Sequence, residues 1–267
     1  MKLKQKIHFI FSLLDYNYSP FAASISFFTL LSIFPFCIIL LSFLFLIYGV
    51  ENIDNTLQIL SKYFTAYGIE LIRKHIINNF QQFRANLNIL SFIALIWSSM
   101  NLYSAIESGI NAVYEIKTGR GFFHSRLISL IILIFLIPSL LFIAQVHLFY
   151  QKIWNHIGIE NFYLSFSLRI MIIFLSLFAL HSLAYVFIPY KKITFRSTIP
   201  GTIFSTICWV LISIFFDWYI NNYTFYNKIY GSLAAIVIFL FYLYLISTFF
   251  LMGARLNVLK NKIETDA

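Results

Sequence analysis

Charged side chains are scarce in this sequence. Only 11% of the 267 residues are Asp, Glu, Lys or Arg, whereas 60% are apolar and 20% are aromatic. A soluble domain carries about 25% charged residues, so this chain has too few polar groups to cover a surface that faces water. The scarcity excludes an ordinary cytosolic enzyme and a disordered chain, and it indicates a protein that crosses a membrane several times.

Cysteines and catalytic motifs are also few. Cys37 and Cys208 each lie inside an apolar run, so they indicate small buried residues and not a disulfide framework or a metal site. The chain has no H-E-x-x-H, G-x-S-x-G or G-x-x-x-x-G-K-[ST] motif, and its ten acids are scattered. We therefore expect no cofactor, no bound metal and no enzymatic activity.

Six stretches without Asp, Glu, Lys or Arg predict the fold. Each has about the 20 residues that an α-helix needs to cross the hydrocarbon core. The sequence thus predicts an all-α, polytopic membrane helix bundle, a single integral domain over residues 1–267 with spans at 20–48, 87–106, 127–150, 170–189, 197–216 and 229–254. Pro35 and Pro138 lie inside the first and third spans and predict helix kinks there, because proline removes a helical hydrogen bond.

Basic residues predict which side of the membrane each loop faces. The N-terminal tail, the second loop, the fourth loop and the C-terminal tail each hold three Lys or Arg. By the positive-inside rule these segments are cytoplasmic, which makes residues 1–18 a cytoplasmic interfacial segment and residues 255–267 a cytoplasmic tail. The net charge of +9 is then explained by basic residues that orient the protein in the membrane and face anionic lipid headgroups. Nucleic acid is not expected as a partner.

The long first loop, residues 51–86, is predicted to be extracytoplasmic and helical. Its apolar residues step by threes, fours and fives, a pattern that is typical of an amphipathic helix. Such a helix either covers the outer mouth of the bundle or rests on the outer leaflet.

A polar face follows the second span toward the cytoplasm. Hydrocarbon does not solvate amides or carboxylates, so this face must meet protein or water. One interpretation is a polar cavity that opens to the cytoplasm; the other is hydrogen bonding between helices, which Asn and Ser commonly supply. The predicted cavity residues are Trp97, Asn101, Ser104, Glu107, Ser108 and Asn111.

Two further features carry ionisable groups. His181 lies near the middle of the fourth span, where it is either a proton-linked group or a neutral histidine that bonds to a neighbouring helix. Arg120 and Arg126 surround a tight turn in the second loop. Their guanidinium forks suit phosphate groups, although the positive-inside rule alone also accounts for arginines at this place.

Three motifs in the last third of the chain are specific. They read Ile-Pro-Gly-Thr at 199–202, Tyr-Gly-Ser-Leu-Ala-Ala at 230–235 and Gly-Ala-Arg-Leu-Asn at 253–257. With them, residues 8–260 resemble the YihY / virulence factor BrkB family of membrane proteins. One departure stands out, because the family usually has glutamate where this chain has Arg255.

The resemblance implies a bacterial inner-membrane protein of about six spans, and the positive-inside rule places both termini in the cytoplasm. Some family members carry an old ribonuclease BN label, while others are linked to serum resistance or to the export of envelope lipids. The absence of hydrolytic motifs gives the ribonuclease label no support in this sequence.

Two functions fit these observations. In the first, the protein transports or flips an envelope lipid or another amphiphile, passively or linked to an ion, and an anionic headgroup is held by Arg120, Arg126, Arg255 and Asn257. In the second, it is a non-transporting scaffold that assembles envelope proteins or forms a homo-oligomer. Membrane lipids are the expected partners in both, and a membrane-bound enzyme is the third and weakest hypothesis.

Overall fold

The described part of the chain is built from helices. The structure, a computed structural model, describes residues 12–13, 16–48, 86–117, 121, 123–131, 162–222 and 232–265. Its long helices are α2 (Ser19–Tyr48), α6 (Asn86–Val113), α8 (Phe162–Phe187), α9 (Phe195–Asn222) and α11 (Ser232–Thr265). A shorter helical stretch covers residues 123–131. Because the described residues contain no strand, the all-helical prediction is confirmed for them.

Three of the described helices are long and apolar enough to cross a membrane. The qualifying stretches are Ile89–Val113, Phe195–Tyr219 and Ile236–Asn261, and two shorter apolar stretches lie in α2 and α8. Several predicted segments lie outside the described residues: residues 51–85 of the loop predicted at 51–86, most of the third span with Pro138, most of the segment 1–18, and residues 229–231 of the last span. Six spans and the loop arrangement therefore stay predictions.

Three helices continue well past the predicted ends of their spans. α6 reaches Val113 instead of ending near residue 106, α9 reaches Asn222 instead of residue 216, and α11 reaches Thr265, through most of the predicted tail. No proline or glycine follows Gly253 in the chain, so nothing in the sequence interrupts α11. This extension brings the end of α11 alongside the residues that follow α6.

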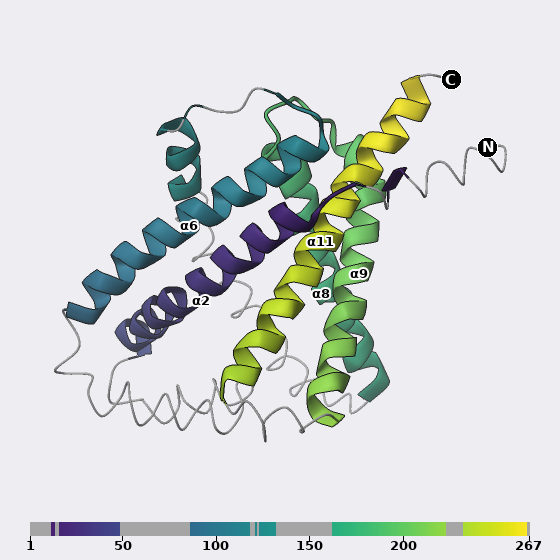
Figure 1. Cartoon of the computed structure of the whole chain (residues 1–267). Helices are drawn as coiled ribbons and strands as arrows, with labels where there is room; N and C mark the ends of the chain where they lie inside the picture. Colours follow the sequence, from purple (N-terminus) through teal and green to yellow (C-terminus); the bar gives the residue numbers. More distant parts are fainter. Residues whose placement is uncertain are drawn as a thin grey trace.

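The helices meet at one end of the bundle. α11 packs against α9, α2 and α6, while α8 packs mainly against α9. Figure 1 shows the start of α2, the end of α6 and the loop from α8 to α9 gathered beside α11, whose last turns extend beyond them. We call this region the polar end, and it comprises residues 16–19, 111–117, 123–126, 188–196 and 253–260.

An apolar cluster lies beneath the polar end. Its buried members come from the segment before α2 and from α2, α6, α8 and α11: Tyr18, Ala22, Ile25, Ala105, Ile110, Val113, Tyr185, Leu251 and Ala254. The two alanines of α2 and α6 leave room for those helices to approach closely.

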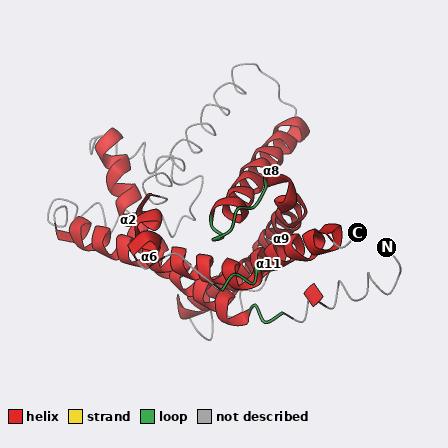
Figure 2. Ribbon diagram, turned by 90° about the horizontal axis from the view of Figure 1, so that it is seen from above, coloured by secondary structure: helices red, strands yellow, loops and turns green. Residues whose placement is uncertain are grey.

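Pro35 lies inside α2, and its side chain is buried. Figures 1 and 2 show that the second half of α2 runs in a different direction from the first half. Proline lacks the amide hydrogen that the preceding turn would accept, so a change of direction at this position has a local cause.

α9 and α11 approach each other closely at two glycines. A Cβ atom on Gly253 would collide with Oγ of Ser205, and it would lie 2.7 Å from both the Gly201 carbonyl oxygen and the Tyr185 hydroxyl. A Cβ on Gly201 would likewise collide with the carbonyl oxygen of Gly253. Only glycine fits at these two positions, so the I-P-G-T and G-A-R-L-N motifs are two halves of one contact.

Many hydroxyl side chains bond to the carbonyl four residues earlier in their own helix. Examples are Thr29 to Ile25, Ser32 to Phe28, Thr202 to Thr198, Ser247 to Leu243 and Thr248 to Tyr244, at 2.6–2.8 Å. These bonds satisfy the hydroxyls without a second helix. The polar contacts that hold helices together therefore involve other side chains.

We predict that Gly253→Ala destabilises the folded protein although alanine is the better helix former. The added methyl has no space against Ser205 and Gly201, and overpacking of this kind costs about 1–3 kcal/mol. Thermal unfolding in detergent, followed by size-exclusion chromatography, should show a lower midpoint. Gly121→Ala is the control, because a Cβ there meets nothing within 4 Å; equal midpoints for both variants would contradict the contact.

Candidate functional site

The six predicted cavity residues lie along α6 but differ in their surroundings. Trp97 is 57% exposed and packs its ring edge against Phe28 of α2. Asn101 and Ser104 are half-buried, and Ser108 is exposed. Glu107 and Asn111 are buried at 6% and 8% exposure. Exposure therefore varies along the face, because exposed Ser108 lies between buried Glu107 and buried Asn111.

Helix 123–131 lies against this face. Two nitrogens of the Arg126 guanidinium donate to Oδ1 of Asn101, at 3.3 and 3.2 Å. One residue earlier, the Ser125 hydroxyl donates to Oε2 of Glu107 at 2.6 Å. Asn101 and Glu107, predicted for the cavity, thus contact the helix that carries Arg126, predicted for headgroup binding.

Asn111 connects α6 to the loop between α8 and α9. Its side-chain oxygen accepts a hydrogen bond of 2.9 Å from the backbone amide of Tyr190. The Asn111 side chain is buried, so its oxygen needs a hydrogen-bond donor within the protein. The Tyr190 amide is such a donor. The residue therefore fixes the position of the loop on α6.

An ion pair joins the end of α6 to α11. Glu115, which follows α6, accepts a hydrogen bond of 2.9 Å from Arg255. Its backbone φ of +59° is uncommon for a residue other than glycine, and it turns the chain out of the helix. The Arg255 guanidinium also lies 5.2 Å from the centre of the Tyr16 ring, within the range of a cation–π contact.

The pair also bears on Tyr16. Burial raises the pKa of the Tyr16 hydroxyl, while the charge of Arg255 opposes the rise and that of Glu115 adds to it. Arg255 is therefore part of a three-residue contact among Tyr16, Glu115 and α11. Arg255, where the family usually has glutamate, is thus paired with a carboxylate, that of Glu115.

Asn257 holds α9 and α11 together. Its fully buried side chain accepts a 2.6 Å hydrogen bond from the amide of Gly201. Tyr114, which follows α6, is half-buried, and burial raises the pKa of its phenol to about 12. The phenol is therefore protonated at neutral pH, while the bond from Gly201 to Asn257 links α9 to α11.

His181 is fully buried between α8, α9 and α11. Its Nδ1 lies 3.1 Å from Oγ1 of Thr206, and within the described residues its Nε2 has no hydrogen-bond partner. The ring packs against Trp209 and Phe250, with centroid distances of 5.2 and 5.7 Å. The His181 ring thus has one polar neighbour, Thr206, and two aromatic neighbours, Trp209 and Phe250.

A second polar contact lies one turn along α8. The Tyr185 hydroxyl is 2.6 Å from Oγ of Ser205 and donates to the backbone carbonyl of Phe250 at 2.6 Å. These bonds sit beside the Gly201–Gly253 contact. Sequence reasoning did not single out Tyr185, because a tyrosine in an apolar run gives no sign of its partner.

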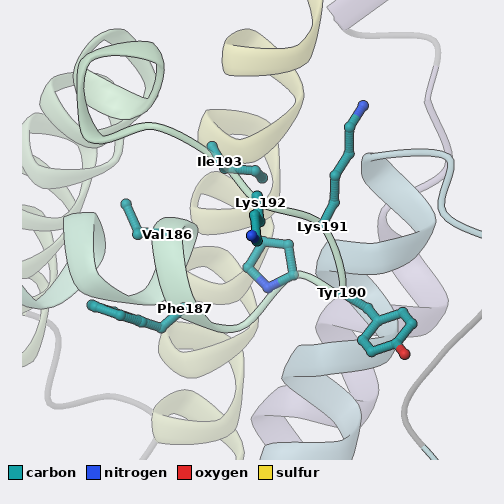
Figure 3. Close-up of a pocket in the computed structure, with 7 residues that line it drawn as sticks. Val186, Phe187, Tyr190, Lys191, Lys192 and Ile193 are labelled. Atoms are coloured by element: carbon teal, nitrogen blue, oxygen red, sulfur yellow. The ribbon is translucent and has the colours of Figure 1, made fainter.

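A groove of about 450 Å³ lies at the polar end and is shown in Figure 3. The sequence did not predict this groove, because Lys191 and Lys192 were interpreted only as part of the basic fourth loop that indicates membrane orientation. Its lining consists of Val186, Phe187, Pro189, Tyr190, Lys191, Lys192 and Ile193. No residue predicted for the cavity or for headgroup binding is among them.

The remaining predicted site residues are Arg120 and Pro138, which lie outside the described residues. Among the residues that the structure does describe, no group of three or more His, Cys, Asp or Glu could hold a metal ion.

We predict that Arg255→Glu destabilises the protein, because it places a second carboxylate beside Glu115. Like charges repel, and the contact with Tyr16 is lost. Combining it with Glu115→Arg should recover most of the lost thermal stability in detergent. Lys117→Gln is the control, an exposed charge two residues from Glu115. Failure of the double variant to recover stability would show that the pair does not couple the helices.

Comparison with known proteins places these features in a family. The virulence factor BrkB family matches residues 11–267. The chain is 29% identical over 252 residues to the ribonuclease-like protein YfkH of Bacillus subtilis (strain 168), covering 90% of this chain and 89% of the relative. No solved structure matches the chain.

Other relatives are named as membrane proteins. The chain is 27% identical to a UPF0761 membrane protein of Glaesserella parasuis, over 66% of this chain and 62% of the relative. It is 24% identical to one of a Psychrobacter species, over 88% of this chain but 44% of the relative. The match across nearly the whole chain, together with the apolar helices, shows that this protein is a membrane protein and belongs to the virulence factor BrkB family.

Proposed function

We propose that the protein crosses the bacterial inner membrane six times and that its polar end faces the cytoplasm. Basic residues from three segments that lie far apart in the sequence share this end, among them Arg126, Lys191 and Arg255. The positive-inside rule predicts such a concentration on the cytoplasmic side. Both chain termini are then cytoplasmic, and residues 51–86 are extracytoplasmic.

We further propose that the protein transports or flips an anionic envelope lipid or a similar amphiphile. The observation that carries this proposal is the contact between Arg126 and the polar face of α6. Its bonds to the neutral Asn101 amide are 3.2 and 3.3 Å long, whereas charge-assisted bonds are about 2.7–2.9 Å. A phosphate is a better acceptor than an amide, so a headgroup could replace Asn101 on Arg126.

The other predicted residues would support this site. Arg255 contacts Glu115 and Tyr16, and Asn257 accepts a bond from Gly201. In this arrangement the two residues position the helices near Arg126. Since the chain has no nucleotide-binding motif, transfer would be passive or linked to an ion. His181, with one ring nitrogen on Thr206, is the candidate for a proton-linked step.

A scaffold without transport activity is the second candidate. One observation favours it: Ser125 and Arg126 bond to Glu107 and Asn101, and they partly cover the face on which transport would depend. In this case the polar contacts would only join helices, and the partners would be envelope proteins or a second copy of the chain.

We propose that the protein is not an enzyme. One relative is named ribonuclease-like, but this sequence contains neither an H-E-x-x-H nor a G-x-S-x-G motif. A ribonuclease assay on protein freed of contaminating nucleases tests the point, and activity that copurifies with the protein through a second chromatographic step would overturn it.

We predict that Arg126→Gln slows transfer of anionic lipid between leaflets. Loss of a charged hydrogen-bonding group costs about 1.5–3 kcal/mol, so the rate should fall about tenfold or more in proteoliposomes that carry a labelled anionic lipid. Arg196→Gln, which removes an exposed arginine at the same end, should leave the rate unchanged.

The transport proposal itself has a simpler test. Liposomes with and without the wild-type protein should differ in lipid transfer for at least one lipid in a series of headgroups. Equal transfer rates with and without the protein, for every lipid in the series, would contradict the proposal. Recovery of a defined protein complex in mild detergent would then favour the scaffold.

A further inference from the structure

The groove beside the α8–α9 loop combines two kinds of surface. Lys191 and Lys192 supply positive charge, and Phe187, Val186 and Ile193 supply apolar wall. No acidic residue is among those that line it. Figure 3 shows Lys191 extending from the loop, while Val186 and Phe187 come from the last turn of α8.

The loop that carries the two lysines is held at three points. The Ile188 amide donates to the Ala184 carbonyl at 3.1 Å, and the Ser197 amide donates to the Thr194 carbonyl at 3.1 Å. Between them, the Tyr190 amide donates to buried Asn111 of α6. The positions of the lysine backbones are therefore fixed before any ligand binds, which lowers the entropic cost of binding.

The two lysines have no internal acceptor. Both are exposed, and within the described residues neither makes a hydrogen bond or an ion pair. The acids at this end are engaged elsewhere: Glu115 pairs with Arg255, and Glu107 accepts a bond from Ser125. An anion that enters the groove would thus find no carboxylate in the lining that competes for either lysine.

The apolar wall indicates what kind of anion fits. Phe187 is 68% exposed although it ends an apolar helix and lines the groove. A soluble anion would leave this ring in contact with water, whereas the glycerol and acyl region of a lipid would cover it. A lysine pair beside an exposed aromatic ring is the pattern of a membrane–water interface.

We propose that the groove binds one anionic phospholipid from the adjoining leaflet. Lys191 and Lys192 hold the phosphate, and Phe187 contacts the upper part of an acyl chain. The site lies apart from Arg126 and does not require transfer across the membrane, so it goes beyond the transport proposal. A lipid bound here also contacts the loop that Asn111 fixes on α6.

Lipid binding can be measured directly on the full-length protein. Purified protein in detergent is titrated with phosphatidylglycerol or phosphatidylcholine, and bound lipid is counted by native mass spectrometry. A basic residue near an anionic lipid contributes about fivefold in affinity. Replacing both lysines (Lys191→Gln with Lys192→Gln) should therefore weaken phosphatidylglycerol binding about twenty-five-fold and leave phosphatidylcholine binding unchanged.

A charge-matched control separates the groove from general attraction. Lys117→Gln with Lys260→Gln removes two exposed lysines from the same end, and it lowers the net charge from +9 by the same two units. This control should keep wild-type affinity, as should Lys191→Arg with Lys192→Arg. If the glutamine pair at 191 and 192 binds phosphatidylglycerol as tightly as the control pair does, the proposal is wrong.

A third arm distinguishes a lipid from a free phosphate. Millimolar glycerol 1-phosphate should not displace phosphatidylglycerol, and Phe187→Ser should weaken lipid binding several-fold. Displacement by glycerol phosphate, with no effect of Phe187→Ser, would mean that the groove takes soluble phosphate, and the lipid site would be overturned. Because binding is read without transfer, failure here leaves the result for Arg126 in proteoliposomes unaffected.

Discussion

The close approach of α9 and α11 at Gly201 and Gly253 is the contact on which the remaining arrangement depends. Hydrocarbon offers no hydrogen-bond partner, so a backbone polar group in a membrane bundle is stabilised when the protein supplies one. With no side chain between the two helices, Asn257 reaches the Gly201 amide and Tyr185 reaches a carbonyl of α11. A larger residue at either glycine would separate the helices and leave these buried groups unsatisfied.

The same requirement explains how the polar end is organised. Each connection there joins two elements by a different chemistry: Ser125 donates to a carboxylate, Asn111 accepts from a backbone amide, and Arg255 forms an ion pair. Together they fix α6 to helix 123–131, to the α8–α9 loop and to α11. The lysine groove is a consequence, since its loop takes its position from the bond to Asn111.

Long apolar runs were enough to predict the helical fold, because membrane helices need little beyond length and hydropathy. Partners were harder to predict, because they depend on how helices are rotated and packed. The sequence assigned Asn101 to a cavity and Arg126 to a headgroup, yet the two side chains touch. Arg255 was visible as a departure from the family, but Glu115 lies 140 positions away and nothing local pairs them.

The hydroxyls of Thr29, Ser32 and Ser247 bond to their own helices, and this bears on how the protein is made. A helix whose hydroxyls are already satisfied enters lipid alone at low cost. Asn257 of α11, by contrast, accepts its bond from the Gly201 amide of α9. Because α9 is synthesised before α11, this contact between the two helices forms only after α11 has been made.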